Sequence, residues 1–326
     1  MTDTNPSGTP SVAVAGCGYW GRNLVRNFAE LGELRAVCDA DTASAQALAE
    51  TYGVPARGWD EILADPDIPG VAIATPAATH APLAREALAA GKHVFVEKPM
   101  ALDLTDAEDL ITRAAEAGRT LMVGHLLQYH AAFQTLREHV ARGDIGALRY
   151  VYSNRLNFGK VRHEENILWS FAPHDISMIL SLVGAEPERV DAVGHNYLQP
   201  GIADTTTTHL HFPGGMAAHI FVSWLHPFKE QKLVVIGEDG MMVFDDTRDW
   251  AEKLVLYPHK VAPGERAPVA ERADAEAIAI APSEPLRAEC SHFLGCVAGE
   301  HDPRTDGAEG LRVLRVLHAA QQALDH

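Results

Sequence analysis

The sequence predicts an α/β protein: an N-terminal Rossmann domain with a doubly wound parallel sheet, then an α+β domain with a large open, mostly antiparallel sheet. Two observations predict this fold class. Up to about residue 124, short apolar runs alternate with amphipathic segments, which is typical of a parallel sheet covered on both faces. After that point, longer runs alternate apolar and polar residues, which is typical of an open antiparallel sheet. We therefore predict two domains, at residues 1–124 and 125–326.

In the first domain, strands and helices should follow one another in strict alternation. Thr105 and Glu108 have the spacing of a capping box, which predicts the first turn of the last helix. We expect strands at Val12–Ala15, Leu34–Cys38, Val71–Thr75, His93–Val96 and Thr120–Val123, and helices at Asn23–Leu31, Ala43–Tyr52, His80–Ala90 and Leu104–Ala117.

In the second domain, one helix should precede a series of extended runs. Gly214 and Gly215 stand between two of these runs and predict a hairpin. We expect extended runs at Leu148–Arg155, Val190–Tyr197, Thr205–Phe212, Ala217–Trp224, Gln231–Gly237 and Met241–Asp245, and helices at Ala132–Arg142, Pro285–Ala298 and Ala308–Leu324.

Composition excludes several classes of function. The formal net charge is −17, from 44 acidic and 27 basic residues, so most of the surface repels nucleic acid and anionic membrane. No apolar run could span a bilayer and the first residues lack the pattern of a signal peptide, so we expect a cytoplasmic protein. The four cysteines form no C-x-x-C pair, and their spacing predicts neither a metal site nor a disulfide framework.

A glycine turn follows the first predicted strand. Gly16, Gly18 and Gly21 have the G-x-G-x-x-G spacing of a dinucleotide-binding turn. The first glycine permits the tight turn, the second lets a phosphate approach, and the third lets helix and strand pack closely. Because this turn joins a strand to a helix, we prefer a dinucleotide site to an ordinary turn. Backbone N–H groups at the start of the helix would hold the pyrophosphate, which explains how an acidic chain can bind an anion.

Asp39 is the acidic residue expected about twenty residues beyond this turn. At the end of the second strand its carboxylate would accept hydrogen bonds from ribose hydroxyls and repel a 2′-phosphate, which favours NAD and leaves NADP possible. Alternatively, Asp39 only begins the next loop or caps its helix.

The fourth predicted strand ends in Glu97, Lys98 and Pro99. Strand ends at the carboxyl edge of a parallel sheet face the ligand crevice, and a partly desolvated lysine there can polarise or protonate a reacting oxygen. Pro99 restricts the backbone and should hold Lys98 extended. Alternatively, the two charges are a surface pair that ends the strand.

The glycine turn, TPAATH at Thr75–His80 and GKHVFVEKPM at Gly91–Met100 together resemble the glucose–fructose oxidoreductase/inositol dehydrogenase (Gfo/Idh/MocA) family, over essentially the whole chain. In that family the lysine of EKP lies beside the nicotinamide. The resemblance implies an NAD(P)-dependent sugar dehydrogenase or reductase, with Lys98 as the catalytic candidate and Glu97 as its orienting neighbour. The cofactor site is then expected at Gly16, Gly18, Tyr19, Trp20, Gly21, Asp39, Thr75, Pro76, His80, Glu97 and Lys98.

The family usually carries an aspartate four residues before a histidine at the start of a helix. Here His174 matches the histidine, but Ser170 stands in place of the aspartate. A second catalytic role in proton transfer is expected for His174, because histidine titrates near neutrality. Pro173 before it predicts the start of a helix. Alternatively, His174 is a capping or core residue.

The polar and aromatic segment before His174 resembles family members that act on nucleotide-linked sugars, among them enzymes that oxidise UDP-N-acetylglucosaminuronate at C3 or reduce 3-keto sugars. Its cationic residues could neutralise a substrate phosphate or carboxylate, and its amides could bind hydroxyl groups. The alternative is a solvated loop with a salt bridge from Arg162 to Glu164 or Glu165. Substrate contacts are expected at His125, Gln128, Tyr129, Asn157, Lys160, Arg162, Asn166, Trp169 and Asp175.

The open sheet of the second domain should carry an apolar outer face, formed by Ile220, Val222 and Trp224 against Val234 and Ile236. Because such a face is a liability in a monomer, we expect a homodimer or homotetramer that pairs through this sheet. The sugar substrate and the direction of the reaction stay open, and free-sugar or inositol oxidation is an alternative. A sensor that binds cofactor without turnover is the alternative of another class.

Overall fold

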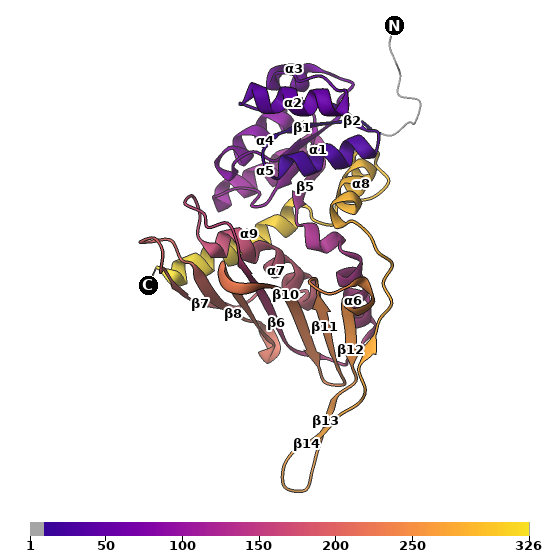
Figure 1. Ribbon diagram of the computed structural model, residues 1–326, viewed down its shortest axis with the longest axis vertical. Coiled ribbons are helices and arrows are strands. Elements are labelled where there is room, and N and C mark those ends of the chain that lie inside the picture. Colours follow the sequence, from indigo (N-terminus) through magenta and orange to yellow (C-terminus); the bar gives the residue numbers. More distant parts are fainter. Residues whose placement is uncertain (1–9, 326) are drawn as a thin grey trace. The chain divides into compact units, whose positions relative to one another are not determined.

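The computed structural model describes residues 10–325, which form two compact units. One unit joins the N-terminal residues up to Tyr129 with residues 284–314, and the other joins residues 130–283 with the end of the chain. The predicted fold class is confirmed, because the first unit contains a parallel sheet and the second contains a mostly antiparallel one (Figure 1). The assignment of a cofactor domain to residues 1–124 and a substrate domain to residues 125–326 stays a prediction.

In the first unit a five-stranded sheet has the order β2-β1-β3-β4-β5, with every neighbouring pair parallel. Its strands are buried on both faces, as their almost uniformly apolar sequences require. The strands are β1 (Val12–Ala15), β2 (Leu34–Cys38), β3 (Gly70–Ile73), β4 (His93–Glu97) and β5 (Leu121–Gly124).

The helices of this unit lie between the strands and also come from the far end of the chain. They are α1 (Gly21–Glu30), α2 (Thr42–Tyr52), α3 (Trp59–Ala64), α4 (His80–Ala89), α5 (Leu104–Ala117), α8 (Pro285–Val297) and α9 (Gly307–Leu324), of which α9 continues into the second unit. Short 3-10 turns η1 (Ala77–Thr79) and η2 (Leu126–Tyr129) follow β3 and β5. The predicted capping box was wrong, because α5 begins at Leu104 and Thr105 already lies inside the helix.

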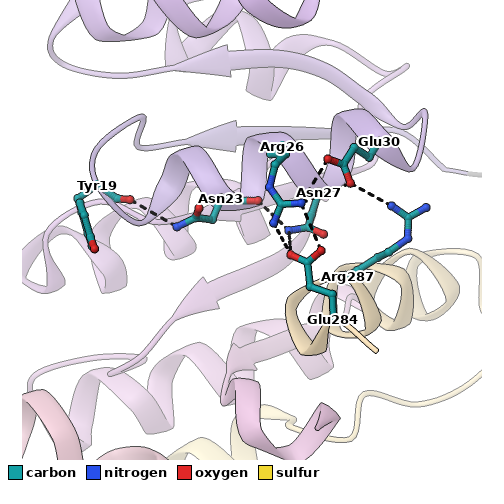
Figure 2. A network of polar contacts seen from close by, with 7 residues as sticks. All are labelled: Tyr19, Asn23, Arg26, Asn27, Glu30, Glu284 and Arg287. Carbon is teal, nitrogen blue, oxygen red and sulfur yellow. Dashed lines mark hydrogen bonds and ion pairs between the residues drawn. The ribbon is translucent and has the colours of Figure 1, made fainter. Parts of the chain in front are cut away.

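Helix α8 belongs to the first unit because its apolar side chains complete the core beside β4. The Phe293 ring packs edge-on against the rings of Phe95 and Phe28, with centroid separations of 5.8 and 6.4 Å. Figure 2 shows the polar side of the same contact: Glu284 pairs with Arg26 of α1 and accepts a hydrogen bond from Asn27 at 3.2 Å. The N-terminal end of α8 is thereby held against α1.

In the second unit an eight-stranded sheet has the order β15-β12-β11-β10-β6-β9-β8-β7. Of its described pairings, β6 with β9 is parallel and the others are antiparallel. The strands of this unit are β6 (Leu148–Phe158), β7 (Arg189–His195), β8 (Thr205–His211), β9 (Ala217–Ser223), β10 (Leu225–Gly237), β11 (Met241–Asp245), β12 (Leu254–Tyr257), β13 (Lys260–Ala262), β14 (Val269–Glu271) and β15 (Glu276–Ala277). Strands β13 and β14 form a separate hairpin that extends beyond the sheet (Figure 1).

Helices α6 (Ala131–Arg142) and α7 (Ile167–Val183) belong to the second unit, together with the 3-10 turns η3 (Pro213–Gly215) and η4 (Trp250–Glu252). Helix α7 packs on β6, β8 and β9. Pro173 lies inside α7 and does not begin it, because Asn166 caps the helix by accepting a hydrogen bond from the N–H of Trp169 at 3.2 Å. The predicted hairpin at Gly214 and Gly215 is confirmed, since η3 joins the antiparallel strands β8 and β9. Within residues 10–325, no helix combines the length and apolar character needed to cross a membrane.

The prediction of a single apolar outer face was wrong, because its residues lie on both sides of the sheet. Ile220 and Val222 are buried on the side that α7 covers, and Trp224 donates a buried hydrogen bond to Asp204 at 2.6 Å. The opposite side carries Val234 in register with Tyr152, which in turn is in register with His219. The tyrosine and histidine rings stack with centroids 5.3 Å apart. The side without α7 is therefore aromatic as well as aliphatic.

Candidate active site

The glycine turn after β1 has the backbone that its spacing predicts. Gly16 has φ of +101°, and a Cβ there would lie 2.5 Å from the carbonyl oxygen of Ala74. A Cβ on Gly21 would lie 1.9 Å from the carbonyl oxygen of Gly16, so the start of α1 can approach the turn only without a side chain. Gly18 differs, because a Cβ there would meet no atom within 4 Å. The space beside the second glycine is open to a ligand.

The start of α1 suits an anion such as a pyrophosphate. No side chain caps the helix and its first turn contains no acidic residue, so its positive end faces no carboxylate from the helix itself. The flanking Tyr19 and Trp20 are exposed by 82% and 37%. With the open space at Gly18, this arrangement fits a dinucleotide pyrophosphate.

Asp39 lies at the end of β2, where an adenosine ribose would be expected. One carboxylate oxygen accepts a hydrogen bond from the N–H of Cys17 at 2.6 Å, and the other accepts from the N–H of Asp41 at 2.8 Å. Asp39 therefore ties the glycine turn to the second strand and remains half-buried. Asp41, and not Asp39, caps the next helix, because its side chain accepts a hydrogen bond from the N–H of Ala43 at 3.1 Å.

His80 connects the segments that follow β3 and β4. Its Nδ1 lies 2.8 Å from the carbonyl oxygen of Pro99 and its Nε2 lies 2.8 Å from that of Thr75. Burial lowers the pKa of His80, so at neutral pH the ring carries one N–H and donates to one carbonyl at a time. His80 is 1% exposed and positions these segments, and its contact with a cofactor stays a prediction.

Lys98 follows β4 at the carboxyl edge of the sheet, is half-buried and is joined to Pro99 by a cis peptide bond. Its neighbour Glu97 is buried and accepts a hydrogen bond from the indole Nε1 of Trp20 at 2.5 Å. Burial raises the pKa of Glu97, against the lowering effects of Trp20 and Lys98. The glycine turn and the EKP segment are thus linked directly by the Trp20–Glu97 bond, which the sequence analysis did not foresee.

Behind Glu97 lies a group of buried ionisable side chains that the sequence analysis also missed. His125 lies 2.6 Å from Glu309 of α9, measured from Nδ1 to Oε2, and both side chains are buried. Glu289 of α8 is fully buried, and its carboxyl oxygens have no hydrogen-bond partner among the described residues. Burial raises the pKa of Glu289 well above its usual value, and the nearby Glu97 and Glu309 raise it further. Only the fold brings these residues, far apart in sequence, together.

The three residues proposed after β5 are all buried. Tyr129 belongs to the hydrophobic core, and its hydroxyl lies 3.0 Å from Oγ1 of Thr305. The backbone carbonyl of Gln128 accepts a hydrogen bond from Arg304 at 2.9 Å. With His125 beside Glu309, these contacts hold the segment in place, and substrate contact by these residues stays a prediction.

In the second unit, neighbouring side chains hold the carboxylate of Asp175, and its contact with substrate stays a prediction. Its carboxylate accepts hydrogen bonds from Nε of Arg155 at 2.6 Å and from the hydroxyl of Ser153 at 2.6 Å. All three side chains are buried. This buried cluster fixes α7 to β6 and so positions the half-buried His174 next to Asp175. The spacing of polar residues along β6 does not predict this cluster.

The remaining substrate candidates lie at and beyond the end of β6. Lys160 is exposed and Asn157 is half-buried, whereas Arg162 pairs with Glu165 at 3.2 Å, one of the salt bridges considered above. Asn166 caps α7 and, together with Trp169, donates hydrogen bonds to the side-chain oxygen of Gln321, at 2.8 and 3.1 Å.

A groove of about 420 Å³ adjoins the end of β6. It is lined by Phe158, Leu225, His226 and Pro227, and Phe158 is 77% exposed. This volume lies within the range that small-molecule sites occupy.

Comparison with known proteins assigns the family. The description "oxidoreductase family, NAD-binding Rossmann fold" matches residues 11–125, and "GFO/IDH/MocA C-terminal domain" matches residues 133–243. The chain therefore belongs to the Gfo/Idh/MocA family and is an NAD-dependent oxidoreductase.

Three relatives illustrate the range of the family. The chain is 31% identical to UDP-N-acetylglucosamine 3-dehydrogenase of Acidithiobacillus ferrooxidans over 320 residues, or 96% of each chain. A solved structure of that enzyme matches with a TM-score of 0.86 over 97% of each chain, at 28% identity. Scyllo-inositol 2-dehydrogenase (NAD+) of Bacillus subtilis is 28% identical over 72% of this chain and 74% of its own. A dTDP-3,4-didehydro-2,6-dideoxy-α-D-glucose 3-reductase of Streptomyces violaceoruber is 37% identical over 42% of each chain.

Proposed function

We propose that this oxidoreductase acts on the C3 hydroxyl of a nucleotide-linked sugar, with a UDP-linked N-acetylhexosamine or its uronate as the substrate class. The observation that carries the proposal is the half-buried Lys98 at the carboxyl edge of the parallel sheet, beside a buried Glu97 that is bound to the glycine turn. The similarity to a UDP-N-acetylglucosamine 3-dehydrogenase over 96% of both chains supports the substrate class.

The roles of the residues follow from their positions. NAD, when bound, supplies the hydride acceptor. The open space at Gly18 and the free start of α1 would hold its pyrophosphate, and Asp39 its ribose. Lys98 would polarise the sugar hydroxyl and take part in moving its proton, while the buried Glu97 keeps the strand end in place. His174, which the Asp175 cluster positions, is proposed as a second proton carrier.

The aromatic groove in the second unit offers a place for the nucleotide base. A base needs a flat apolar surface on which to stack, and Phe158 presents its ring next to Leu225 and Pro227. Lys160 follows two residues later and is exposed, so it could pair with a phosphate of the same ligand. We propose this groove as a base-binding surface of the second unit.

The proposed protein assembly uses the side of the eight-stranded sheet that α7 does not cover. Tyr150 there is 38% exposed and stacks with Tyr152 at a centroid separation of 6.2 Å. An exposed sheet face with stacked aromatic rings favours burial against a second copy of the chain, as a homodimer or homotetramer. Light scattering of the purified protein measures the assembly, and a monomer would contradict it.

The enzymatic proposal is tested by following nicotinamide absorbance with NAD or NADP and a panel of UDP-N-acetylglucosamine, its uronate, N-acetylglucosamine and myo-inositol. We expect turnover with NAD and a UDP-linked sugar. Lys98→Ala should lower kcat by about 10²- to 10⁴-fold with the Kd for NAD nearly unchanged. Lys260→Ala, at an exposed lysine of β13, is the matched control and should leave both values unchanged.

Turnover of myo-inositol or N-acetylglucosamine, with none of the UDP-sugars, would overturn the substrate class. NAD binding without turnover on any member of the panel would favour a sensor. A second candidate reaction, reduction of a 3-keto sugar nucleotide, is favoured by the similarity to the dTDP-sugar 3-reductase. It is distinguished by running the assay with NADH and the 3-keto compound.

A further inference from the structure

A cluster of three metal-ligating side chains lies in the first unit, at the end of α8. His292 and Cys296 are one helical turn apart, and His301 comes from the loop that follows. The ligand atoms of the three side chains all lie within 4.8 Å of one another. Throughout residues 10–325, this is the one group of three histidine, cysteine or acidic side chains with such a spacing. Small shifts of the side chains would bring all three within the bond lengths of a tetrahedral ion.

A glycine on α8 makes the approach of the loop possible. A Cβ at Gly295 would lie 2.3 Å from Cε1 and 2.7 Å from Nε2 of His301, so the imidazole ring rests directly on the helix backbone. The rings of His292 and His301 are nearly parallel, with centroids 4.4 Å apart. The position of His301 therefore depends on the absence of a side chain at 295.

Nε2 of His292 is the ring nitrogen that could bind a metal, although it now accepts a hydrogen bond. The backbone carbonyl of Asp302 accepts a hydrogen bond from the ring, and Nε2 accepts one from the N–H of Arg304 at 3.0 Å. Nε2 therefore carries the lone pair, and a metal ion would replace the Arg304 N–H at this atom. A ring N–H held by a carbonyl is the usual second bond of a metal-binding histidine.

Charges of both signs surround the cluster, with the carboxylate of Asp302 near Cys296 and the guanidinium of Arg304 near His292. The carboxylates of Glu300 and Asp302 come from the same loop, and an Oε2 of Glu300 lies 3.2 Å from the position that a Cβ on Gly295 would occupy. Glu300 thus lies beside the helix at Gly295 but outside the group of three, in a chain with a net charge of −17.

We propose that His292, Cys296 and His301 bind a zinc ion. Thiolate and imidazole are both ligands that Zn²⁺ takes, and three protein ligands leave the fourth tetrahedral position to a water molecule. On binding, the thiol of Cys296 loses its proton to solvent as the Zn–S bond forms, with no change in oxidation state. This site is separate from the EKP site and does not depend on the identity of the sugar.

The ion would fix the loop between α8 and α9. That loop carries Arg304, which donates to the carbonyl of Gln128 at 2.9 Å, and Thr305, which donates to the carbonyl of Val123 at 2.7 Å. Both acceptors belong to the segment around the end of β5. Zinc at this position therefore stabilises the segment that contains His125.

The test uses the full-length chain, stripped of metal and titrated with Co²⁺ and then Zn²⁺. We expect one Co²⁺ per chain, with a thiolate-to-cobalt charge-transfer band and the strong visible bands of tetrahedral cobalt, and both should disappear when Zn²⁺ displaces it. Cys296→Ala should abolish the charge-transfer band. His301→Ala and Gly295→Ala should each weaken binding at least tenfold, and Gly295→Ala is the sharper variant because it keeps all three ligands.

Cys38→Ala is the matched control, since it removes a half-buried thiol outside the cluster, and should bind cobalt like the unaltered chain. The midpoint of thermal unfolding should rise with Zn²⁺ in the unaltered chain and in Cys38→Ala, and rise less at the same Zn²⁺ concentration in His301→Ala. Absence of a charge-transfer band in the unaltered chain would overturn the proposal. So would equal cobalt affinity in the unaltered, His301→Ala and Gly295→Ala chains, a result that does not depend on whether Cys296→Ala folds.

Discussion

Replacing the buried Glu289 should make the protein more stable at neutral pH. Its side chain is fully buried, and its carboxyl oxygens have no hydrogen-bond partner within the described part of the chain. The folded chain must therefore take up a proton at this carboxyl or bury a charge beside Glu97 and Glu309. Glu289→Met fills a similar volume without an ionisable group.

The magnitude follows from the linkage between proton binding and folding. The folded pKa of Glu289 lies above its usual value of 4.5, so its unfavourable contribution is absent below about pH 4.5 and grows as the pH rises toward the folded pKa. The slope is about 1.4 kcal/mol per pH unit. Over the roughly 2.5 units up to pH 7, the upper limit is about 3.5 kcal/mol. We expect Glu289→Met to gain about 1–3 kcal/mol at pH 7, because the methionine packs less perfectly than a native core residue.

The assay is urea unfolding of both chains at several pH values between 5 and 7.5, followed by the fluorescence of the tryptophans. Trp20 and Trp59 report on the first unit, and replacing the other three tryptophans by phenylalanine isolates their signal. The difference in the free energy of unfolding between variant and parent should increase with pH. A constant difference across this range, or a variant less stable than its parent at pH 7, would refute the reasoning. Glu289→Gln is the control for shape, and should show the same pH dependence with a smaller gain because its amide is buried without partners.

Three further predictions test the glycine turn, the α7 support and the surface of α8. Gly18→Ala should fold normally but weaken NAD binding by tenfold or more, since its Cβ would enter the open space beside the turn; unchanged affinity in a fluorescence titration would contradict the pyrophosphate position. Asp175→Ala should lower the free energy of unfolding by about 3–5 kcal/mol, because it leaves the buried Arg155 guanidinium unpaired, and urea denaturation that finds less than 1 kcal/mol would show that the cluster does not support α7. Glu284→Ala should cost at most about 1 kcal/mol, because its pair with Arg26 is more than one-third exposed. The effect should shrink in high salt, and a larger loss that is insensitive to salt would contradict a surface pair.

Much of the fold could be predicted because its signals are local. Where φ is positive, or where a Cβ would clash with a neighbouring carbonyl, the chain needs glycine, and the sequence shows it. Gly16 has a positive φ, and a Cβ on either Gly16 or Gly21 would clash with a carbonyl oxygen. The alternation of buried strands with amphipathic helices likewise follows from backbone periodicity, which each segment carries independently of the others. Errors occurred where two local signals competed: Thr105 resembled a cap, and Pro173 resembled a helix start, but the helices had already begun before each of them.

The sequence by itself determined the class of fold, the dinucleotide turn and the EKP segment, because each depends on residue types at fixed short spacings. Only the tertiary structure decided which distant residues meet: Trp20 with Glu97, His125 with Glu309, Arg155 with Asp175, and His301 with α8. It also decided which side of the second sheet lies beneath α7. The alternation of apolar and polar residues along a strand does not show which of its two faces a helix covers. Such contacts depend on chain packing over long separations, and no spacing in the sequence encodes them.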